Sequence, residues 1–285
     1  RRAPEREGQP ALKGTAYLLY AVRPPQVTNL PSQRAPVPLV RSGQTWQAVD
    51  MKSTMQTTPL LISSMLRYGS TIHASAKIIT WTGTGSRTTT FAEVGTKAAQ
   101  LAHALRGLGI TGDQRVATFM WNNAEHLIAY LAVPSMGAVL HTLNIRLFPP
   151  QIIYVTTHAD NKVVIVDNTL AQPFSGLLPH LKTLRHVIVN GPISDEVRAA
   201  LEAPEHIESV HDFDTLIADQ PTSFDWPEDV NENNASSMCY TSGTTGNPKG
   251  VAYSHRSNYL HAMAVQNGLS IRQGDHLLVV VPLFH

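Results

Sequence analysis

KVVIVD, residues 162–167, decides the fold class of this 285-residue chain. Four consecutive β-branched residues, 163–166, leave no polar face. A strand that is apolar on both sides is typical of a parallel sheet covered by helices on both faces. The run therefore predicts a buried strand, and helices should precede and follow it.

Helical and strand-like patterns alternate before this run. Thr90 stands three residues before Glu93, which is the spacing of a capping box, and apolar residues then recur at helical intervals up to Gly109. Pro149 and Pro150 suit the first turn of another helix. The elements expected before the run are a helix over 90–109, a strand over 114–120, a helix over 123–137, an apolar stretch over 138–144 and a helix over 149–158.

The same rhythm continues after the run. A helix is expected near 171–181 and a strand over 186–190, followed by a polar stretch over 191–234. Two strand-like segments come next, 236–241 and 250–254, and Ser254 should cap a helix that follows them. The alternation predicts an α/β domain with a mostly parallel sheet and right-handed crossovers.

The two ends of the chain differ from its middle. Residues 1–50 contain seven of the 19 prolines and show no sustained period, so we expect a proline-rich irregular extension there. Met51 or Met55 is an expected natural start, because ordered patterning begins shortly afterwards. The other end, LLVVVPLFH (277–285), is apolar and strand-like without a terminating loop, so we expect a fragment. Residues 51–285 would then be one partial domain.

Composition excludes several classes of protein. Residues 1–50 hold seven Arg or Lys against three Asp or Glu, whereas the remainder holds 15 against 18, so nucleic acid is not an expected partner of the main body. Cys239 is the single cysteine and permits no internal disulfide; we expect it to pack as a thiol. The sequence has no apolar run of about 18 residues that would indicate a transmembrane helix.

YTSGTTGNPKG, residues 240–250, separates the last two expected strands and would form a long hairpin tip. Its three glycines let backbone amides converge on one point, four Ser or Thr hydroxyls add donors, and Lys249 adds a positive charge. Such a set favours a polyanion, most naturally a triphosphate. The usual P-loop spacing is absent, because the fifth residue after Gly243 is Pro248 rather than glycine. The structural alternative is a surface hairpin without a ligand.

Other motifs give no support to competing chemistry. The chain has thirteen histidines, but His126 and His141 lack ligand spacing to a further His, Cys or Asp. Glu125-His126 lacks the second histidine of a zincin, and no Gly-x-Ser-x-Gly elbow of a serine hydrolase is present.

The eleven-residue string resembles the signature phosphate loop of the AMP-forming adenylating enzymes, which include acyl-CoA synthetases, adenylation domains and luciferases. The segments RTTTFAEV, HLIAYLAVPSMGAVLHTLNIRL, GVAYSHRS and VPLFH extend the resemblance over about residues 55–285, and they are similar to the medium- and long-chain fatty acyl-CoA synthetase branch. Ile145 and Pro150 depart from the residues that are frequent in this family.

The resemblance implies that ATP activates a fatty acid to an acyl-adenylate, which coenzyme A then attacks. Fixed donors and Mg²⁺ would offset the repulsion between the carboxylate and the phosphates. Lys249 would be catalytic, Thr241 would also contact Mg²⁺, and His285 would border the acyl pocket, although a histidine at a strand end is its plain structural alternative. The residues implied to bind the ATP phosphates are Thr241, Ser242, Gly243, Thr244, Thr245, Gly246 and Lys249.

The resemblance also implies what residues 1–285 do not contain. The family's Mg²⁺-binding glutamate, ribose-binding aspartate, hinge, C-terminal lid domain and late lysine have no counterpart here, so the chain alone is expected to be inactive. A cytoplasmic enzyme, at most peripheral to a membrane, is implied, and a homodimer of the full-length protein remains open. An aryl-acid ligase or another adenylating enzyme is the alternative within this class. A non-catalytic remnant is the alternative from another class.

Overall fold

The computed structural model describes residues 39–42, 45–48, 53–241 and 247–285, and the chain divides into two units, 1–56 and 57–285. The first unit contains strands β1 (Leu39–Ser42) and β2 (Thr45–Ala48), which pair antiparallel. The sequence indicated neither strand.

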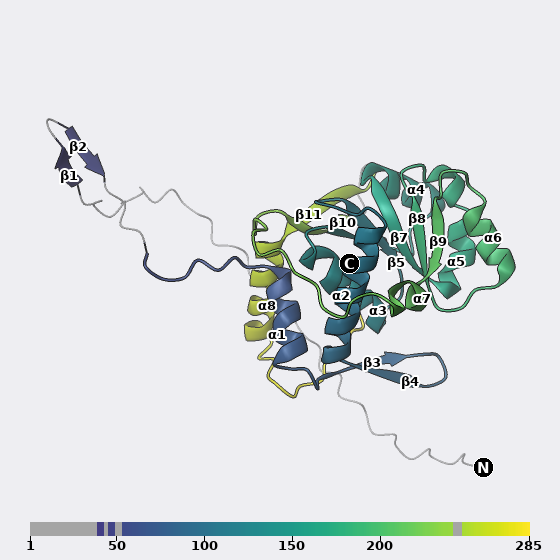
Figure 1. The fold of residues 1–285 in the computed structure, drawn as a ribbon, viewed down its shortest axis with the longest axis horizontal. Helices are drawn as coiled ribbons and strands as arrows, with labels where there is room; N and C mark the ends of the chain where they lie inside the picture. Colours follow the sequence, from purple (N-terminus) through teal and green to yellow (C-terminus); the bar gives the residue numbers. More distant parts are fainter. Residues whose placement is uncertain (1–38, 43–44, 49–52, 242–246) are drawn as a thin grey trace, which may run out of the picture. The chain divides into compact units, whose positions relative to one another are not determined.

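The second unit is an α/β domain (Figure 1). Its strands are β3 (Lys77–Trp81), β4 (Ser86–Thr90), β5 (Arg115–Phe119), β6 (Val139–Thr142), β7 (Asn161–Asp167), β8 (His186–Asn190), β9 (Ser209–Asp212), β10 (Ala235–Thr241) and β11 (Lys249–Ser254). Its helices are α1 (Ile62–Thr71), α2 (Phe91–Gly107), α3 (Ala124–Ser135), α4 (Pro149–His158), α5 (Asn168–Ser175), η1 (Leu178–His180), α6 (Asp195–Glu202), α7 (Phe213–Ala218) and α8 (His255–Gly268).

Seven strands form the main sheet in the order β11-β10-β6-β5-β7-β8-β9. All neighbours pair in parallel except β10 and β11, so β11 is an antiparallel edge strand. Strand β5 lies between β6 and β7. The chain passes from β5 to β6 on one side, and then crosses to β7 on the other side of β5. The carboxyl ends of the strands around such a reversal are where open α/β sheets bind ligands. Strands β3 and β4 form a separate antiparallel pair.

Helices cover both faces of the sheet, as the apolar run 163–166 predicts. Val163 and Ile165 belong to one buried cluster with α2, α3 and α7, whereas Val164 and Val166 belong to a second cluster with α4, α5 and α6. In Figure 1, α4, α5 and α6 lie beside β7, β8 and β9, and α2 and α3 lie toward the other part of the sheet. The domain is therefore a three-layer arrangement with a mostly parallel sheet.

Most expected elements are confirmed. The Thr90 hydroxyl accepts from the Glu93 amide and the Glu93 carboxylate accepts from the Thr90 amide, so the capping box forms as predicted. Helix α4 begins at Pro149, and Ser254 caps α8 through the Ser257 amide. The expected helix over 171–181 is displaced, because α5 begins directly after β7 and only η1 follows it.

Two expectations need correction. The stretch 191–234 contains α6, β9 and α7, which its polar composition concealed. The apolar run 277–285 forms no strand; its first residues lie on the surface, and Leu278 is 84% exposed. No neighbouring strand presents its backbone to this run within the described residues. Hydrophobic composition alone therefore did not determine its structure.

Candidate functional site

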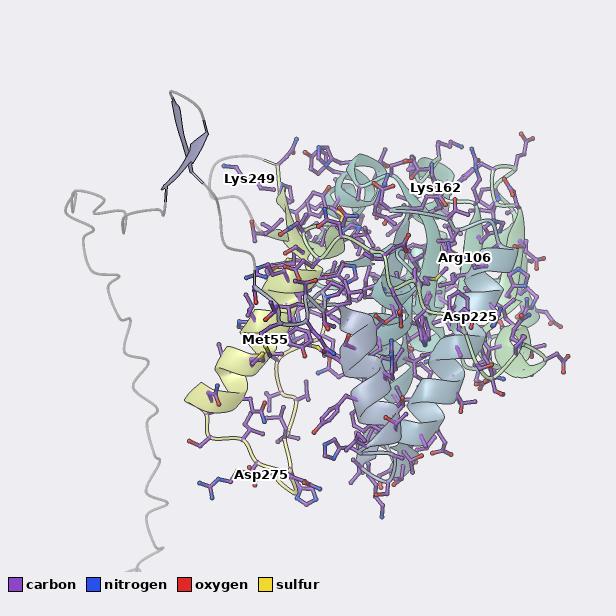
Figure 2. All side chains as sticks on the ribbon, turned by 60° about the vertical axis from the view of Figure 1, so that its left-hand side comes forward. Met55, Arg106, Lys162, Asp225, Lys249 and Asp275 are labelled. Atoms are coloured by element: carbon purple, nitrogen blue, oxygen red, sulfur yellow. The ribbon has the colours of Figure 1, made fainter. Side chains whose placement is uncertain are left out.

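The glycine- and threonine-rich string connects β10 and β11, which pair as an antiparallel hairpin as the sequence predicts. Thr241 and Lys249 are opposite each other in the last pair of that hairpin, and both are exposed. Figure 2 shows Lys249 at the end of β11 nearest the tip. The predicted phosphate-binding residues between them, Ser242, Gly243, Thr244, Thr245 and Gly246, lie outside the described residues. The structure thus brings together the two ends of the predicted site.

The hairpin tip lies at the carboxyl edge of the parallel sheet. Met238 of β10 is in parallel register with His141 of β6, so Thr241 and Thr142 end their strands on the same side. A loop at this edge meets the ligand-binding side of an open α/β sheet.

Tyr240, the first residue of the loop string, is anchored from two directions. Its hydroxyl oxygen is 2.6 Å from Nδ1 of His158, at the end of α4. A methyl group on Gly250 would lie 3.1 Å from Cζ of the Tyr240 ring, so glycine there lets the ring pack against the opposite strand. Burial raises the pKa of Tyr240, which therefore stays neutral near pH 7. These contacts fix the strand from which the loop leaves.

His141 lies beneath this anchor. Its Nδ1 is 2.9 Å from the side-chain nitrogen Nδ2 of Asn161, and its ring centroid is 5.2 Å from that of Tyr240. Burial lowers the pKa of His141 to about 4, so the ring is neutral near pH 7. Nε2 is buried and has no hydrogen-bond partner among the described residues. His141 therefore serves as packing below Tyr240.

His126 is a satisfied core residue rather than a metal ligand. Its Nδ1 is 3.0 Å from the Trp121 carbonyl and its Nε2 is 2.9 Å from the Thr118 hydroxyl, so both ring nitrogens are used. Burial lowers its pKa to about 4. In the described part of the chain, no group of three or more His, Cys, Asp or Glu could hold a metal ion.

Thr241 is the residue expected to contact Mg²⁺. Thr241 offers one hydroxyl oxygen, whereas Mg²⁺ is usually held by one or two carboxylates together with substrate phosphates. Thr241 alone is therefore not a complete Mg²⁺ site, and a metal there would also need phosphate oxygens as ligands.

His285 is placed beside the same edge of the sheet. The carbonyl of Phe284 accepts a hydrogen bond from the Thr142 hydroxyl at 3.3 Å, and the Leu283 carbonyl accepts one from Tyr130. Phe284 is buried, His285 is exposed, and their ring centroids are 4.8 Å apart. The segment that carries His285 thus ends next to the strand that neighbours β10.

A polar network that the sequence did not indicate surrounds Asp167, at the end of β7. The carboxylate accepts from the Trp121 amide at 2.6 Å, from the Asn190 side chain at 2.7 Å and from the Asn123 side chain at 3.0 Å. Burial raises the pKa of Asp167, and these three donors work against that rise. The network ties the ends of β5, β7 and β8 together, and so stiffens the carboxyl edge.

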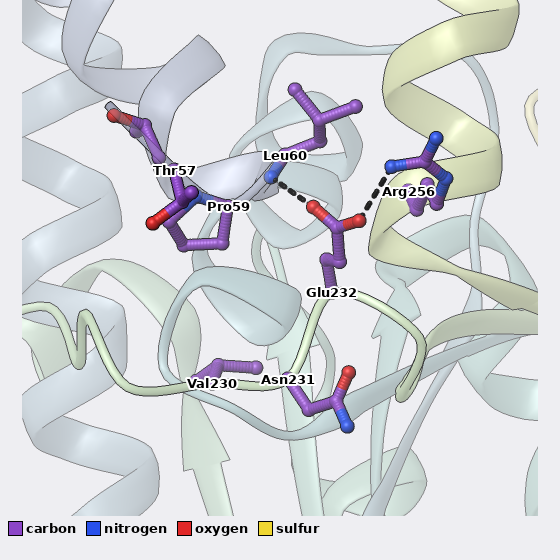
Figure 3. A pocket seen from close by; sticks show the side chains of 8 residues that line it. Thr57, Pro59, Leu60, Val230, Asn231, Glu232 and Arg256 are labelled. Carbon is purple, nitrogen blue, oxygen red and sulfur yellow. Dashed lines mark hydrogen bonds and ion pairs between the residues drawn. The ribbon is translucent and has the colours of Figure 1, made fainter. Parts of the chain in front are cut away.

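A pocket of about 520 Å³ lies elsewhere, at the start of α8 (Figure 3). Glu232 crosses it, accepting from the Leu60 amide at 2.8 Å and from the Arg256 guanidinium at 2.5 Å. Because the Leu60 amide and Arg256 both bind the carboxylate, the pKa of Glu232 is lowered. Arg256 follows the end of β11 opposite to Lys249, so this pocket is separate from the hairpin tip. Its polar groups hold the chain segment before α1.

The described helices include none that is both long and apolar enough to cross a membrane.

The fold is a mostly parallel α/β domain with a hairpin at one edge of its sheet, whose tip lies on the carboxyl side. Residues 71–285 match the AMP-binding enzyme family, and the chain belongs to that family.

Two curated relatives are similar to this chain. It is 41% identical over 242 residues to a 3-methylmercaptopropionyl-CoA ligase of Ruegeria pomeroyi, covering 82% of this chain and 43% of that protein. It is 40% identical over 241 residues to a medium-chain-fatty-acid–CoA ligase of Ectopseudomonas oleovorans, covering 82% of this chain and 42% of the relative. The chain thus spans less than half the length of these two relatives.

The fold is also similar to solved structures. The N-terminal domain of FACL13 from Mycobacterium tuberculosis, solved with an inhibitor, matches 79% of this chain with a TM-score of 0.63 and 25% identity. The match covers 52% of that domain. The mostly parallel α/β architecture predicted from the sequence is therefore confirmed as that of an adenylate-forming domain.

Proposed function

We propose that this chain is part of the adenylation domain of an AMP-forming acyl-CoA ligase. The observation that carries the proposal is the position of the Thr241–Lys249 pair, at the carboxyl edge of the sheet and beside the strand that contacts the Phe284–His285 segment. One side of this edge would hold the phosphates of ATP, and the other would hold the acid.

The chemistry follows from charge. A carboxylate that attacks the α-phosphorus of ATP approaches a polyanion, and pyrophosphate leaves with further negative charge. Lys249 and the donors from Thr241 to Gly246 would stabilise that charge as it develops, which lowers the barrier. Thr241 would face the metal that ATP brings with it. Coenzyme A would then attack the acyl-adenylate through its thiol and release AMP.

Residues 51–285 are proposed to act as one partial adenylation domain preceded by the extension 1–50. The adenine and ribose contacts, the acidic metal ligand and a second catalytic domain would come from the remaining length that relatives have. The polypeptide with that length included is the full-length enzyme. A cytoplasmic location belongs to the same proposal.

The acid is the open choice within this class. The similarity to a medium-chain fatty acid ligase favours a fatty acid, whereas the similarity to a 3-methylmercaptopropionyl-CoA ligase favours a short thioether acid. We propose a fatty or similarly apolar aliphatic acid, and an aryl acid is the second candidate.

Acid-dependent exchange of pyrophosphate into ATP by the full-length enzyme tests the proposal. The panel contains 3-methylmercaptopropionate, butyrate, octanoate, palmitate and benzoate, with coenzyme A omitted so that only adenylation is read. Exchange with at least one aliphatic acid supports the function. Exchange with benzoate alone would move the assignment to aryl acids, and no exchange with any acid would favour a non-catalytic remnant.

A further inference from the structure

One side chain, Asn122, holds three backbone groups of the segment that leads to His285. Its Nδ2 donates to the Val279 carbonyl at 3.1 Å and to the Val281 carbonyl at 3.0 Å. Its Oδ1 accepts from the Leu283 amide at 2.8 Å. The side-chain amide therefore contacts alternate residues, 279, 281 and 283, through its nitrogen and its oxygen.

Hydrophobic burial does not explain how this stretch is held. Val279, Val280 and Val281 are all exposed, and the stretch forms no strand. Pro282 and Leu283 are half-buried, and Phe284 is the first buried residue, at 3% exposed. Asn122 thus supplies the ordered contacts in front of Phe284, and Tyr130 and Thr142 supply those to the carbonyls of Leu283 and Phe284.

The origin of Asn122 makes these contacts relevant to the site. It lies in the connection from β5 to α3, three residues after the end of β5, and the next residue caps α3. Strand β5 is the one between β6 and β7, where the strand order reverses. The backbone beside it is fixed, because the Trp121 amide and the Asn123 side chain both donate to Asp167. Asn122 therefore projects from a rigid edge.

We propose that Asn122 is a positioning residue that sets where Phe284 and His285 stand on the acid side of the site. This inference rests on the proposed function. It predicts a specific chemical requirement: a carboxamide satisfies two carbonyls and one amide, whereas a carboxylate of the same shape would oppose both carbonyls. Asn122→Asp should therefore be at least as damaging as Asn122→Ala.

The test compares both variants with Asn258→Asp. Asn258 donates from its Nδ2 to the Ser236 and Ser237 hydroxyls at 2.9 and 3.0 Å, so it is a matched amide at the other end of β10. In the full-length enzyme, the Asn122 variants should raise the KM for the acid roughly tenfold to a hundredfold, while the KM for ATP changes less than about threefold. Asn258→Asp should not separate the two KM values.

Hydrogen exchange gives a second measurement that needs no activity. The peptide covering 279–285 should exchange faster in both Asn122 variants than in the wild type and in Asn258→Asp. Unchanged exchange would overturn the proposal because the contacts would not restrain the segment. Faster exchange with equal changes in both KM values would also overturn it and leave Asn122 a structural role only. If the wild type lacks acid-dependent exchange of pyrophosphate, the proposed function fails and the positioning role with it, while hydrogen exchange still reports the restraint.

Discussion

The Tyr240 hydroxyl oxygen lies 2.6 Å from Nδ1 of His158, which joins the base of the hairpin tip to the end of α4 across 82 positions of sequence. Tyr240 is partly buried and His158 closes a helix, so the bond links the loop-bearing strand to a fixed element. Strand β11 is the edge strand of the sheet and, in the described part of the chain, pairs only with β10.

A double-mutant cycle should detect this link. Tyr240→Phe and His158→Ala are each expected to lower the free energy of unfolding by about 1 kcal/mol, with the double variant losing less than the sum because one hydrogen bond is removed only once. Urea unfolding of the 285-residue chain measures the three values. Strict additivity would show that the two side chains do not interact in solution.

Lys249→Ala should slow adenylation in the full-length enzyme by roughly tenfold to a thousandfold, because a cation beside the leaving pyrophosphate is lost. The measurement is acid-dependent exchange of pyrophosphate into ATP. Lys182→Ala is the control, since Lys182 is exposed and lies between η1 and β8, away from the hairpin. An unchanged rate in Lys249→Ala would remove this lysine from the site.

Two of the buried histidines, His126 and His141, should make the fold sensitive to acid. The pKa of His126 and of His141 is lowered by burial from 6.5 to about 4, so the unfolded chain binds protons that the folded chain does not. The contribution of each neutral histidine to the free energy of unfolding is fully present above pH 6.5. It should fall by about 3 kcal/mol for each histidine as the pH drops to about 4.

Variants can assign this pH dependence. His126→Gln should flatten the decline between pH 6.5 and 4, measured as the free energy of unfolding in urea. His276→Gln, at a histidine that is exposed, should leave the slope unchanged. An equal slope in all three proteins would contradict the assignment.

The Arg87–Glu125 ion pair should be one of the few charge pairs that matter for stability. Arg87 donates both terminal nitrogens to the Glu125 carboxylate at 2.7 and 2.6 Å, and the Glu125 side chain is only 4% exposed. Burial alone would raise the pKa of Glu125, but the bonds and charge of Arg87 outweigh it and the pKa is lowered. Arg87→Ala leaves a buried carboxylate unpaired and should cost about 3 kcal/mol at pH 7.

Arg67→Ala is the matched comparison, because the Arg67–Glu228 pair is 3.4 Å long and exposed on both sides. It should cost less than about 1 kcal/mol. Thermal or urea unfolding of both variants measures the two losses in stability. Similar losses would mean that burial does not determine how much these ion pairs stabilise the fold.

The 285-residue chain alone should not form acyl-CoA. In the proposed function, the adenine and ribose contacts and the acidic metal ligand come from residues outside 1–285. The run Leu277–Val281 is exposed, which favours aggregation. Incubation with ATP, Mg²⁺, coenzyme A and the acid panel measures release of AMP. Acid-dependent release above that of a Lys249→Ala chain would show that these residues suffice.

Sequence patterns predicted the parts of the fold that repeat a local rule. The β-branched run 163–166, the Thr90–Glu93 capping box and the proline pair before α4 each act within a few residues, and each is confirmed. Strand β9 escaped prediction because it is a short edge strand with all four residues half-buried, so it carries no clear apolar period.

The site shows the same division. Glycine, threonine and proline in the loop string predicted the position of the hairpin tip. The side chains that hold the neighbouring segments, His158 and Asn122, could not be predicted from the sequence. His158 lies 82 positions from Tyr240, and Asn122 lies 157 to 161 positions from the carbonyls and amide that it binds. A side chain that satisfies distant backbone groups leaves no period or spacing in the sequence.

Glu232 links an early segment of the domain, before α1, to the start of α8, which the ribosome makes much later. Its carboxylate accepts a hydrogen bond from the amide of Leu60, which is made 172 residues earlier (Figure 3). The Ile62 amide likewise donates to Nδ1 of His255, which is made 193 residues later. At about 5 to 20 residues per second, a ribosome takes about 10 to 40 s to deliver these partners. We therefore expect the segment before α1 to stay open to proteases on the nascent chain until the hairpin and the start of α8 have emerged.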